Sequence, residues 1–168
     1  MILRGRVHRL GDDINTDYII PARYKSRTED IASLVPVLFE DLDPTLTGRI
    51  RPGDIIAAGE NFGMGSSRET APRLLRAAGI GAVLARSFAR IFFRNAVNVG
   101  LPVIECDTGP LADGDQVEVD LGCGEIRVPA RGVAIRAAPL PPLMAAILEA
   151  GGIRDYLRRQ AAGEGGVP

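Results

Sequence analysis

Short apolar segments alternate with segments of helical periodicity through the middle of this 168-residue chain. Apolar runs of about four to eight residues are typical of buried strands, whereas apolar residues spaced about three and four positions apart indicate a helix packed on one face. In chain order these segments are Asp54–Gly59 (strand), Thr70–Ala78 (helix), Ile80–Ala85 (strand), Phe88–Val99 (helix) and Leu101–Cys106 (strand). Strands separated by helices in this way pair in parallel through right-handed crossovers. We therefore predict an α/β fold built around a parallel βαβαβ unit.

Further elements are expected on both sides of this unit, within one domain that spans residues 1–168. Alternating polar and apolar residues predict strands, and apolar residues at helical spacing predict helices. The expected elements are a strand at Ile2–Leu10, an extended piece at Tyr18–Pro21, a mobile polar stretch at Ala22–Asp30, a helical segment at Ile31–Glu40, a hairpin of Gln116–Leu121 with Glu125–Val128, helices at Leu143–Leu148 and Ile153–Arg159, and a disordered tail at 161–168.

A glycine-rich loop lies between the first strand and the first helix of the unit. It reads Gly63-Met64-Gly65-Ser66-Ser67-Arg68-Glu69. The first N–H groups of a helix are unpaired and its dipole is positive there, and glycine lets a ligand approach the backbone. The guanidinium of Arg68 is a planar fork that suits a carboxylate or a phosphate. The loop therefore predicts a site for an anion.

A purely structural interpretation of this loop stays open. Ser66 with Glu69 three residues later forms the pattern of a capping box, and Ser87 has the position of an N-cap for the next helix. The loop lacks the lysine of the phosphate-binding P-loop, and it matches neither the nucleophile elbow nor a complete dinucleotide fingerprint. Chemistry other than nucleotide binding or acyl transfer is indicated.

The composition is that of an ordinary folded domain, with 46% hydrophobic residues, 24% charged residues and a net charge of −1. This balance excludes a disordered chain and gives no global basic surface for nucleic acid. Between residues 61 and 100, however, Glu69 is the single acid among several arginines, which are Arg68, Arg73, Arg76, Arg86, Arg90 and Arg94. This bias fits an anionic small molecule, an acidic partner surface, or simply solvated helix faces.

The chain offers few metal ligands. His8 is the only histidine and falls in an expected strand, where a structural role is expected. Cys106 and Cys123 are too far apart for a metal knuckle, and they do not suggest a disulfide framework. We therefore expect no metal ion or cofactor on this chain. The N-terminus lacks an apolar signal core and no run is long enough to span a membrane, so we expect a cytoplasmic protein with no membrane partner.

Three segments, taken together, carry a family resemblance. They are Gly11–Asp17, Gly59–Glu69 and Ala85–Asn95. In combination they resemble the small subunits of 3-isopropylmalate dehydratase and homoaconitase, which are stand-alone versions of the aconitase swivel domain. The similarity extends from about Ile2 to about Arg159. It implies a swivelling β/β/α domain with a mixed sheet and flanking helices.

The resemblance also implies an activity and a partner. A separate large subunit would hold a [4Fe–4S] cluster, in a heterodimer or heterotetramer, and a di- or tricarboxylate substrate would lie between the two chains. The reaction implied is that of a hydro-lyase, which moves a hydroxyl between neighbouring carbons of a malate-type acid by dehydration and rehydration. The isolated chain is expected to be inactive.

Residue roles follow from the resemblance by position. Ser66 matches the catalytic serine that, as an alkoxide, takes the proton from the carbon next to a carboxylate. Arg68 matches the arginine that binds a substrate carboxylate, and Ser67 would support either group. Thr16 and Asp17 match a pair in the active-site loop, where Asp17 would orient catalytic groups. For Asp17 an Asx-turn remains an equal alternative when the match is set aside.

The resemblance also implies that the segment Tyr24–Thr28, which follows the Thr16-Asp17 pair, selects the substrate, and we expect this segment to be mobile without the partner. Arg27 would suit the extra carboxylate of homoaconitate (lysine biosynthesis), whereas Tyr24 and the aliphatic stem of Lys25 would line an apolar pocket for 3-isopropylmalate (leucine biosynthesis). We expect 3-isopropylmalate, with homoaconitate or another alkylmalate as the alternative. A non-catalytic anion- or RNA-binding module is a third possibility, which the near-neutral charge and the single lysine disfavour.

Overall fold

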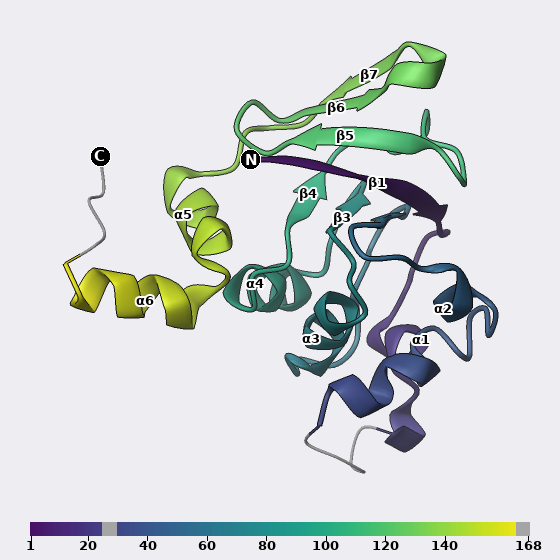
Figure 1. The fold of residues 1–168 in the computed structure, drawn as a ribbon. Coiled ribbons are helices and arrows are strands. Elements are labelled where there is room, and N and C mark those ends of the chain that lie inside the picture. The colour runs from purple at the N-terminus through teal and green to yellow at the C-terminus, as the bar shows by residue number, and fades with distance from the viewer. Residues whose placement is uncertain (25–29, 164–168) are drawn as a thin grey trace.

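A mixed seven-stranded sheet organises the protein, with the strand order β4-β3-β2-β1-β5-β6-β7 (Figure 1). The computed structural model describes residues 1–24 and 30–163. β1 pairs in parallel with β2 and antiparallel with β5, so it joins a parallel half of the sheet to an antiparallel half. The strands are β1 (Ile2–Arg9), β2 (Ile55–Ala57), β3 (Ala82–Ala85), β4 (Val103–Glu105), β5 (Gln116–Asp120), β6 (Glu125–Val128) and β7 (Val133–Arg136).

Helices α3 and α4 connect the parallel strands, which confirms the predicted βαβαβ unit. α5 and α6 follow the antiparallel strands and pack against α4 (Figure 1). The helices are α1 (Thr16–Ile19), α2 (Leu46–Arg49), α3 (Thr70–Ala77), α4 (Arg90–Asn98), α5 (Pro142–Ala150) and α6 (Ile153–Ala161), with 3-10 helices η1 (Ala22–Tyr24), η2 (Ala32–Val37) and η3 (Pro129–Arg131). The prediction of an α/β fold with a mixed sheet and flanking helices is confirmed.

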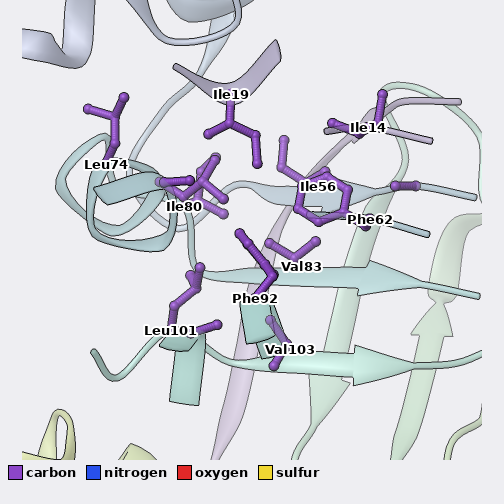
Figure 2. Close-up of a cluster of buried hydrophobic side chains, with 14 of the residues drawn as sticks. Ile14, Ile19, Ile56, Phe62, Leu74, Ile80, Val83, Phe92, Leu101 and Val103 are labelled. Atoms are coloured by element: carbon purple, nitrogen blue, oxygen red, sulfur yellow. The ribbon is translucent and has the colours of Figure 1, made fainter. Parts of the chain in front are cut away.

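Two hydrophobic cores lie on opposite faces of the parallel strands. Ile56 and Val83 point into the larger core, beneath the helices, where they meet Phe62 and Phe92 (Figure 2). Ile55, next to Ile56 in the chain, points to the other face, where the antiparallel strands supply the remaining side chains. Successive strand residues face opposite sides, so β2 and β3 are buried on both. The result is three layers: antiparallel strands, parallel strands and helices.

Several local predictions were wrong. Thr16–Ile19, partly expected to be extended, forms α1 because the Asn15 side chain accepts the N–H groups of Asp17 and Tyr18 at 2.8 and 3.0 Å. Ala22–Tyr24, the start of the stretch expected to be mobile, forms the 3-10 helix η1, and residues 25–29 of that stretch lie outside the described residues.

The C-terminal part also differs from the prediction. Ala161, assigned to a disordered tail, is the last residue of α6, and residues 164–168 lie outside the described residues. The strand β7 was not predicted. Within the part of the chain that the structure describes, no helix is long and apolar enough to cross a membrane.

A buried pair ties β1 to the turn before β2. His8 and Asp54 are 1% and 5% exposed, and His8 Nε2 lies 2.7 Å from Asp54 Oδ2. His8 Nδ1 has no hydrogen-bond partner among the described residues, so Asp54 alone orients the ring. Burial by itself raises the pKa of Asp54. The hydrogen bonds from His8 and from the backbone N–H groups of Arg51 and Arg6 outweigh burial and hold that pKa below its usual range. The expected structural role of His8 is consistent with this geometry.

Asp54→Asn is expected to lower the free energy of unfolding at pH 7 by about 1–3 kcal/mol, because it removes the charged acceptor of a buried pair. A carboxyl whose pKa is depressed by folding stabilises the protein above the unfolded pKa of about 3.9, and this contribution is lost as pH falls through the folded pKa. Urea titrations at pH 7 and below pH 4 should therefore show the variant and wild type converging in acid. The surface change Asp107→Asn is the control, and an equal loss at both pH values would refute the ionic role.

Candidate functional site

The glycine-rich loop after β2 lies against the loop after β1. Backbone N–H groups of one loop donate to carbonyls of the other along most of their length. The pairs are Gly59 N to Gly11 O (3.0 Å), Asp13 N to Glu60 O (2.8 Å), Gly63 N to Ile14 O (2.7 Å) and Thr16 N to Met64 O (2.8 Å). Two segments that the sequence analysis singled out separately are therefore one structural unit.

The third segment of the resemblance, Ala85–Asn95, is hydrogen-bonded to the same glycine-rich loop. Phe62 N donates to Ser87 O at 3.0 Å, and Ala89 N donates to Phe62 O at 2.9 Å. Ser87 was predicted to cap α4, and this is wrong: its Oγ accepts from the backbone N–H of Asn61 at 2.9 Å, and α4 begins at Arg90. The Ser87 hydroxyl therefore binds the N–H of a residue 26 positions away in sequence, and not an N–H group of α4.

Two glycines of the loop are required by its geometry. Gly63 has φ +82°, and a Cβ on it would lie 2.1 Å from Cγ of the buried Phe92. Gly65 has φ +106°, and a Cβ on it would approach Thr16 Oγ1 to 3.1 Å. A positive φ strains other residues, and the packing at Gly63 leaves no room for a side chain. These positions bring the loop backbone directly onto α4 and α1.

The backbone N–H and the side-chain hydroxyl of Ser66 both form hydrogen bonds. Its backbone N–H donates to Thr16 Oγ1 at 3.0 Å, and its Oγ accepts the backbone N–H of Arg68 at 3.3 Å. The predicted capping box is wrong, because α3 begins at Thr70 with Glu69 as its N-cap residue and no side-chain cap. Ser66 therefore belongs to a separate turn before the helix, and its half-buried hydroxyl is placed by that turn.

Ser67 and Arg68 are exposed on the same turn. The Ser67 carbonyl accepts a hydrogen bond from Asn95 Nδ2 of α4 at 2.8 Å. The guanidinium of Arg68 makes no hydrogen bond or ion pair with the residues that the structure describes, so it is available to an anion. A small depression beside Ser66 is lined by Thr16, Ile20, Ser66, Arg68, Thr70 and Ala71. It is too small to hold a substrate, so the described residues do not enclose a ligand at this turn.

The remaining predicted site residues differ in their placement. Thr16 is 2% exposed and lies behind Ser66, whereas Asp17 is exposed beside it. The side chain that forms the local cap is that of Asn15, not of Asp17. Tyr24 is half-buried against the larger core, with the Arg23 guanidinium 4.9 Å from its ring centroid.

Tyr24 is placed in part by its neighbour. The guanidinium of Arg23 also donates to Asp41 at 2.8 Å and to Glu40 at 2.5 Å. These bonds hold the residue directly before Tyr24, and so the N-terminal end of the predicted selectivity segment. Lys25 and Arg27, the other two side chains predicted to select the substrate, lie outside the described residues.

The arginine bias has a partly structural explanation. Arg76 donates hydrogen bonds to the carbonyls of Val99 and Gly151. Arg86 forms an ion pair with Asp107, in which Nε lies 3.7 Å from Oδ1. The others that the sequence analysis named are exposed, and their guanidinium groups make no hydrogen bond or ion pair within residues 1–24 and 30–163; they are Arg68, Arg73, Arg90 and Arg94.

The described residues contain no group of three or more histidine, cysteine or acidic side chains that could hold a metal ion. Cys123 is exposed, whereas Cys106 is buried, and burial raises the pKa of its thiol to about 11.

Asn95 is a residue of the site to which the sequence analysis gave no role of its own. It closes the third segment of the resemblance, and a polar side chain at that position of an otherwise apolar-faced helix was the available signal.

Comparison with known proteins extends these observations. Residues 49–108 match the family described as the aconitase C-terminal domain. The chain is 49% identical to a 3-isopropylmalate dehydratase small subunit of Archaeoglobus fulgidus, over 95% of this chain and 96% of the relative. It is 47% identical to the isopropylmalate/citramalate isomerase small subunit of Methanocaldococcus jannaschii, over 96% of each. The crystal structure of a 3-isopropylmalate dehydratase from the latter organism superimposes with a TM-score of 0.92, at 44% identity and 98% coverage of both chains.

Proposed function

Since the chain belongs to the family of 3-isopropylmalate dehydratase small subunits, we propose that it is the small subunit of a hydro-lyase that isomerises a malate-type acid by dehydration and rehydration. The observation that carries this proposal is the Ser66–Arg68 turn, which Thr16 and Asn95 hold from two separate segments while Ser67 and Arg68 stay exposed. A turn that is held and exposed in this way is suited to a substrate that a second chain covers.

Ser66 is proposed as the catalytic base. As an alkoxide its Oγ would take the proton from the substrate carbon next to a carboxylate, and would return that proton in the reverse direction. The backbone N–H of Arg68, 3.3 Å from this oxygen, favours the anionic form by hydrogen bonding. The guanidinium of Arg68 is proposed to bind the neighbouring carboxylate through two parallel hydrogen bonds.

Ser67 and Asp17, which are both exposed, are proposed as supporting groups, Ser67 toward the alkoxide or a carboxylate and Asp17 in orienting catalytic groups. Thr16, predicted to bind substrate, is instead proposed to act through Ser66, because it is 2% exposed and its hydroxyl oxygen accepts the Ser66 N–H.

A large subunit with a [4Fe–4S] cluster is proposed as the partner. The cluster would supply a Lewis acid that polarises the substrate hydroxyl. This chain would supply the base and the carboxylate-binding arginine. The proposed location is the cytoplasm, and the net charge of −1 gives no electrostatic support to nucleic-acid binding.

3-Isopropylmalate is the proposed substrate, with homoaconitate or another alkylmalate as the alternative. Tyr24 begins the proposed selectivity segment, and its packing against the core fixes where that segment starts. Lys25 and Arg27 remain proposed contributors to the choice.

The test is reconstitution. The purified chain is expected to be inactive and free of iron, and to gain activity on 3-isopropylmalate when co-purified with its large subunit. Absorbance of the unsaturated dehydration product reports turnover, and homoaconitate and citramalate are run beside it. Stoichiometric iron on the isolated chain would contradict the assignment of the cluster to the partner. A fully loaded complex inactive on all these acids would contradict the proposed function.

A further inference from the structure

Asn95 joins α4 to the Ser66–Arg68 turn through one hydrogen bond. Its Nδ2 donates to the Ser67 carbonyl at 2.8 Å, across 28 positions of sequence. We propose that Asn95 is a positioning residue, which orients the Arg68 backbone N–H onto Ser66 Oγ by holding the Ser67 carbonyl. This inference rests on the proposed role of Ser66 and adds a residue to it.

The planarity of the peptide bond carries the effect from one atom to the other. The Ser67 carbonyl and the Arg68 N–H belong to one peptide unit, which is planar and trans, so the two groups point in opposite directions. Asn95 holds the carbonyl edge of this plane, and the N–H edge then points at Ser66 Oγ, 3.3 Å away. Rotation of the plane would swing the N–H away from the hydroxyl.

The Asn95 side chain starts from a rigid base. Phe92, one helical turn earlier, is 2% exposed and lies directly against the backbone of Gly63. Its ring also meets Phe62 edge-on at a centroid distance of 5.3 Å. α4 is therefore packed onto the glycine loop itself, so its distance from the Ser66–Arg68 turn is set by buried contacts.

Thr16 restrains the turn through a second hydrogen bond, in which its Oγ1 accepts the N–H of Ser66. The two restraints act on successive parts of one short turn and come from elements far apart in sequence. The Ser66 hydroxyl is thus placed before a substrate or a partner arrives, and this is the condition under which a fixed N–H donor stabilises developing negative charge without reorganisation.

Asn95→Ala in the reconstituted enzyme is expected to lower kcat by about 10- to 100-fold. Removal of a complete oxyanion donor typically lowers kcat by about 10²–10³-fold, and here the N–H donor is misaligned but still present. KM should change little, because the Arg68 guanidinium remains. With its N–H donor misaligned, the Ser66 alkoxide is less favoured, so the limb of the kcat profile in which the rate rises as the base loses its proton should move to higher pH.

Asn95→Asp separates positioning from packing. Aspartate keeps the volume and shape of asparagine, but an ionised carboxylate cannot donate to the Ser67 carbonyl. We expect it to lose at least as much kcat as the alanine variant, whereas a space-filling role would leave it active. Asn98→Ala is the matched control, since Asn98 is half-buried on the same helix and its side chain bonds to none of the residues described.

An NMR measurement on the isolated chain tests the geometry independently of activity. The Arg68 amide resonance should shift in Asn95→Ala and Asn95→Asp and stay in place in Asn98→Ala. An unmoved Arg68 amide overturns the inference whatever the enzyme does. An active wild-type complex with unchanged kcat and pH profile in both Asn95 variants overturns it as well. Inactivity of the wild-type complex, by contrast, counts against the proposed function, while the amide shifts still decide the role of Asn95 in the turn.

Discussion

Ser66→Ala should reduce kcat of the reconstituted enzyme by about 10²–10⁴-fold, the range that positioned acid–base groups contribute. The substitution removes the oxygen that would take the substrate proton and leaves the Arg68 guanidinium in place. KM should therefore stay close to the wild-type value. Initial rates over a range of 3-isopropylmalate concentrations separate the two constants.

The fold should tolerate this change. The Ser66 hydroxyl accepts one hydrogen bond, from the Arg68 N–H at 3.3 Å, and it caps no helix. Its loss should cost less than about 1 kcal/mol of unfolding free energy, as for an ordinary hydrogen bond at a partly exposed site. Ser33→Ala serves as the control, because Ser33 is exposed and its Oγ donates to the Asp30 carbonyl. Retention of most of the rate in Ser66→Ala would leave Ser66 a structural residue of the turn.

The central elements of the fold could be predicted because their patterns are local. β2 and β3 are apolar along their whole length, β4 is apolar except for Glu105 at its end, and α3 carries a clear apolar stripe, so each segment can be recognised without its neighbours. β7 could not be found in this way. Only Ile135 of its residues is buried, and it is a strand because β6 offers it an antiparallel partner. Sheet membership at an edge depends on pairing, which a single segment does not encode.

The two predicted caps failed for different reasons. Ser66 Oγ does accept a local N–H, that of Arg68, but the turn that they form ends before α3, which begins at Thr70. Ser87 Oγ accepts the N–H of Asn61, a residue 26 positions away in sequence. A local pattern reveals neither where the helix begins nor which distant segment meets the side chain.

The residues of the site were accessible from sequence to different degrees. Ser66 and Arg68 lie on the exposed turn where the loop pattern predicted an anion site, although their catalytic and binding roles remain proposals. Thr16 and Asn95 act, in our proposal, through backbone groups of that turn. The polar side chain of Asn95 on an apolar-faced helix was a weak signal in the sequence, but its partner is a distant peptide group that no spacing encodes, so its role becomes visible only when α4 and the loop are seen together.

Arg68→Lys is expected to raise KM by about 10- to 100-fold, because one ammonium cannot reproduce the two parallel hydrogen bonds of a guanidinium to a carboxylate. A charge-assisted hydrogen bond contributes about 1.5–3 kcal/mol, which corresponds to that range. The backbone N–H of residue 68 survives the substitution and still faces Ser66 Oγ. kcat at saturating substrate should therefore fall far less than in Ser66→Ala.

The separate effects of Arg68→Lys on KM and on kcat identify the role of Arg68. Arg73→Lys is the matched control, since Arg73 is exposed on α3 and its guanidinium, like that of Arg68, bonds to none of the described residues. If Arg68→Lys lowered kcat and left KM unchanged, its guanidinium would act on the reacting atoms rather than on a carboxylate of the bound acid. If neither constant moved, the exposed guanidinium would lie outside the site, and the partner subunit would have to supply the carboxylate-binding cation. Ser67 and Arg68 are exposed, so a partner residue has access to this turn, and the separate effects on KM and kcat decide which chain binds the carboxylate.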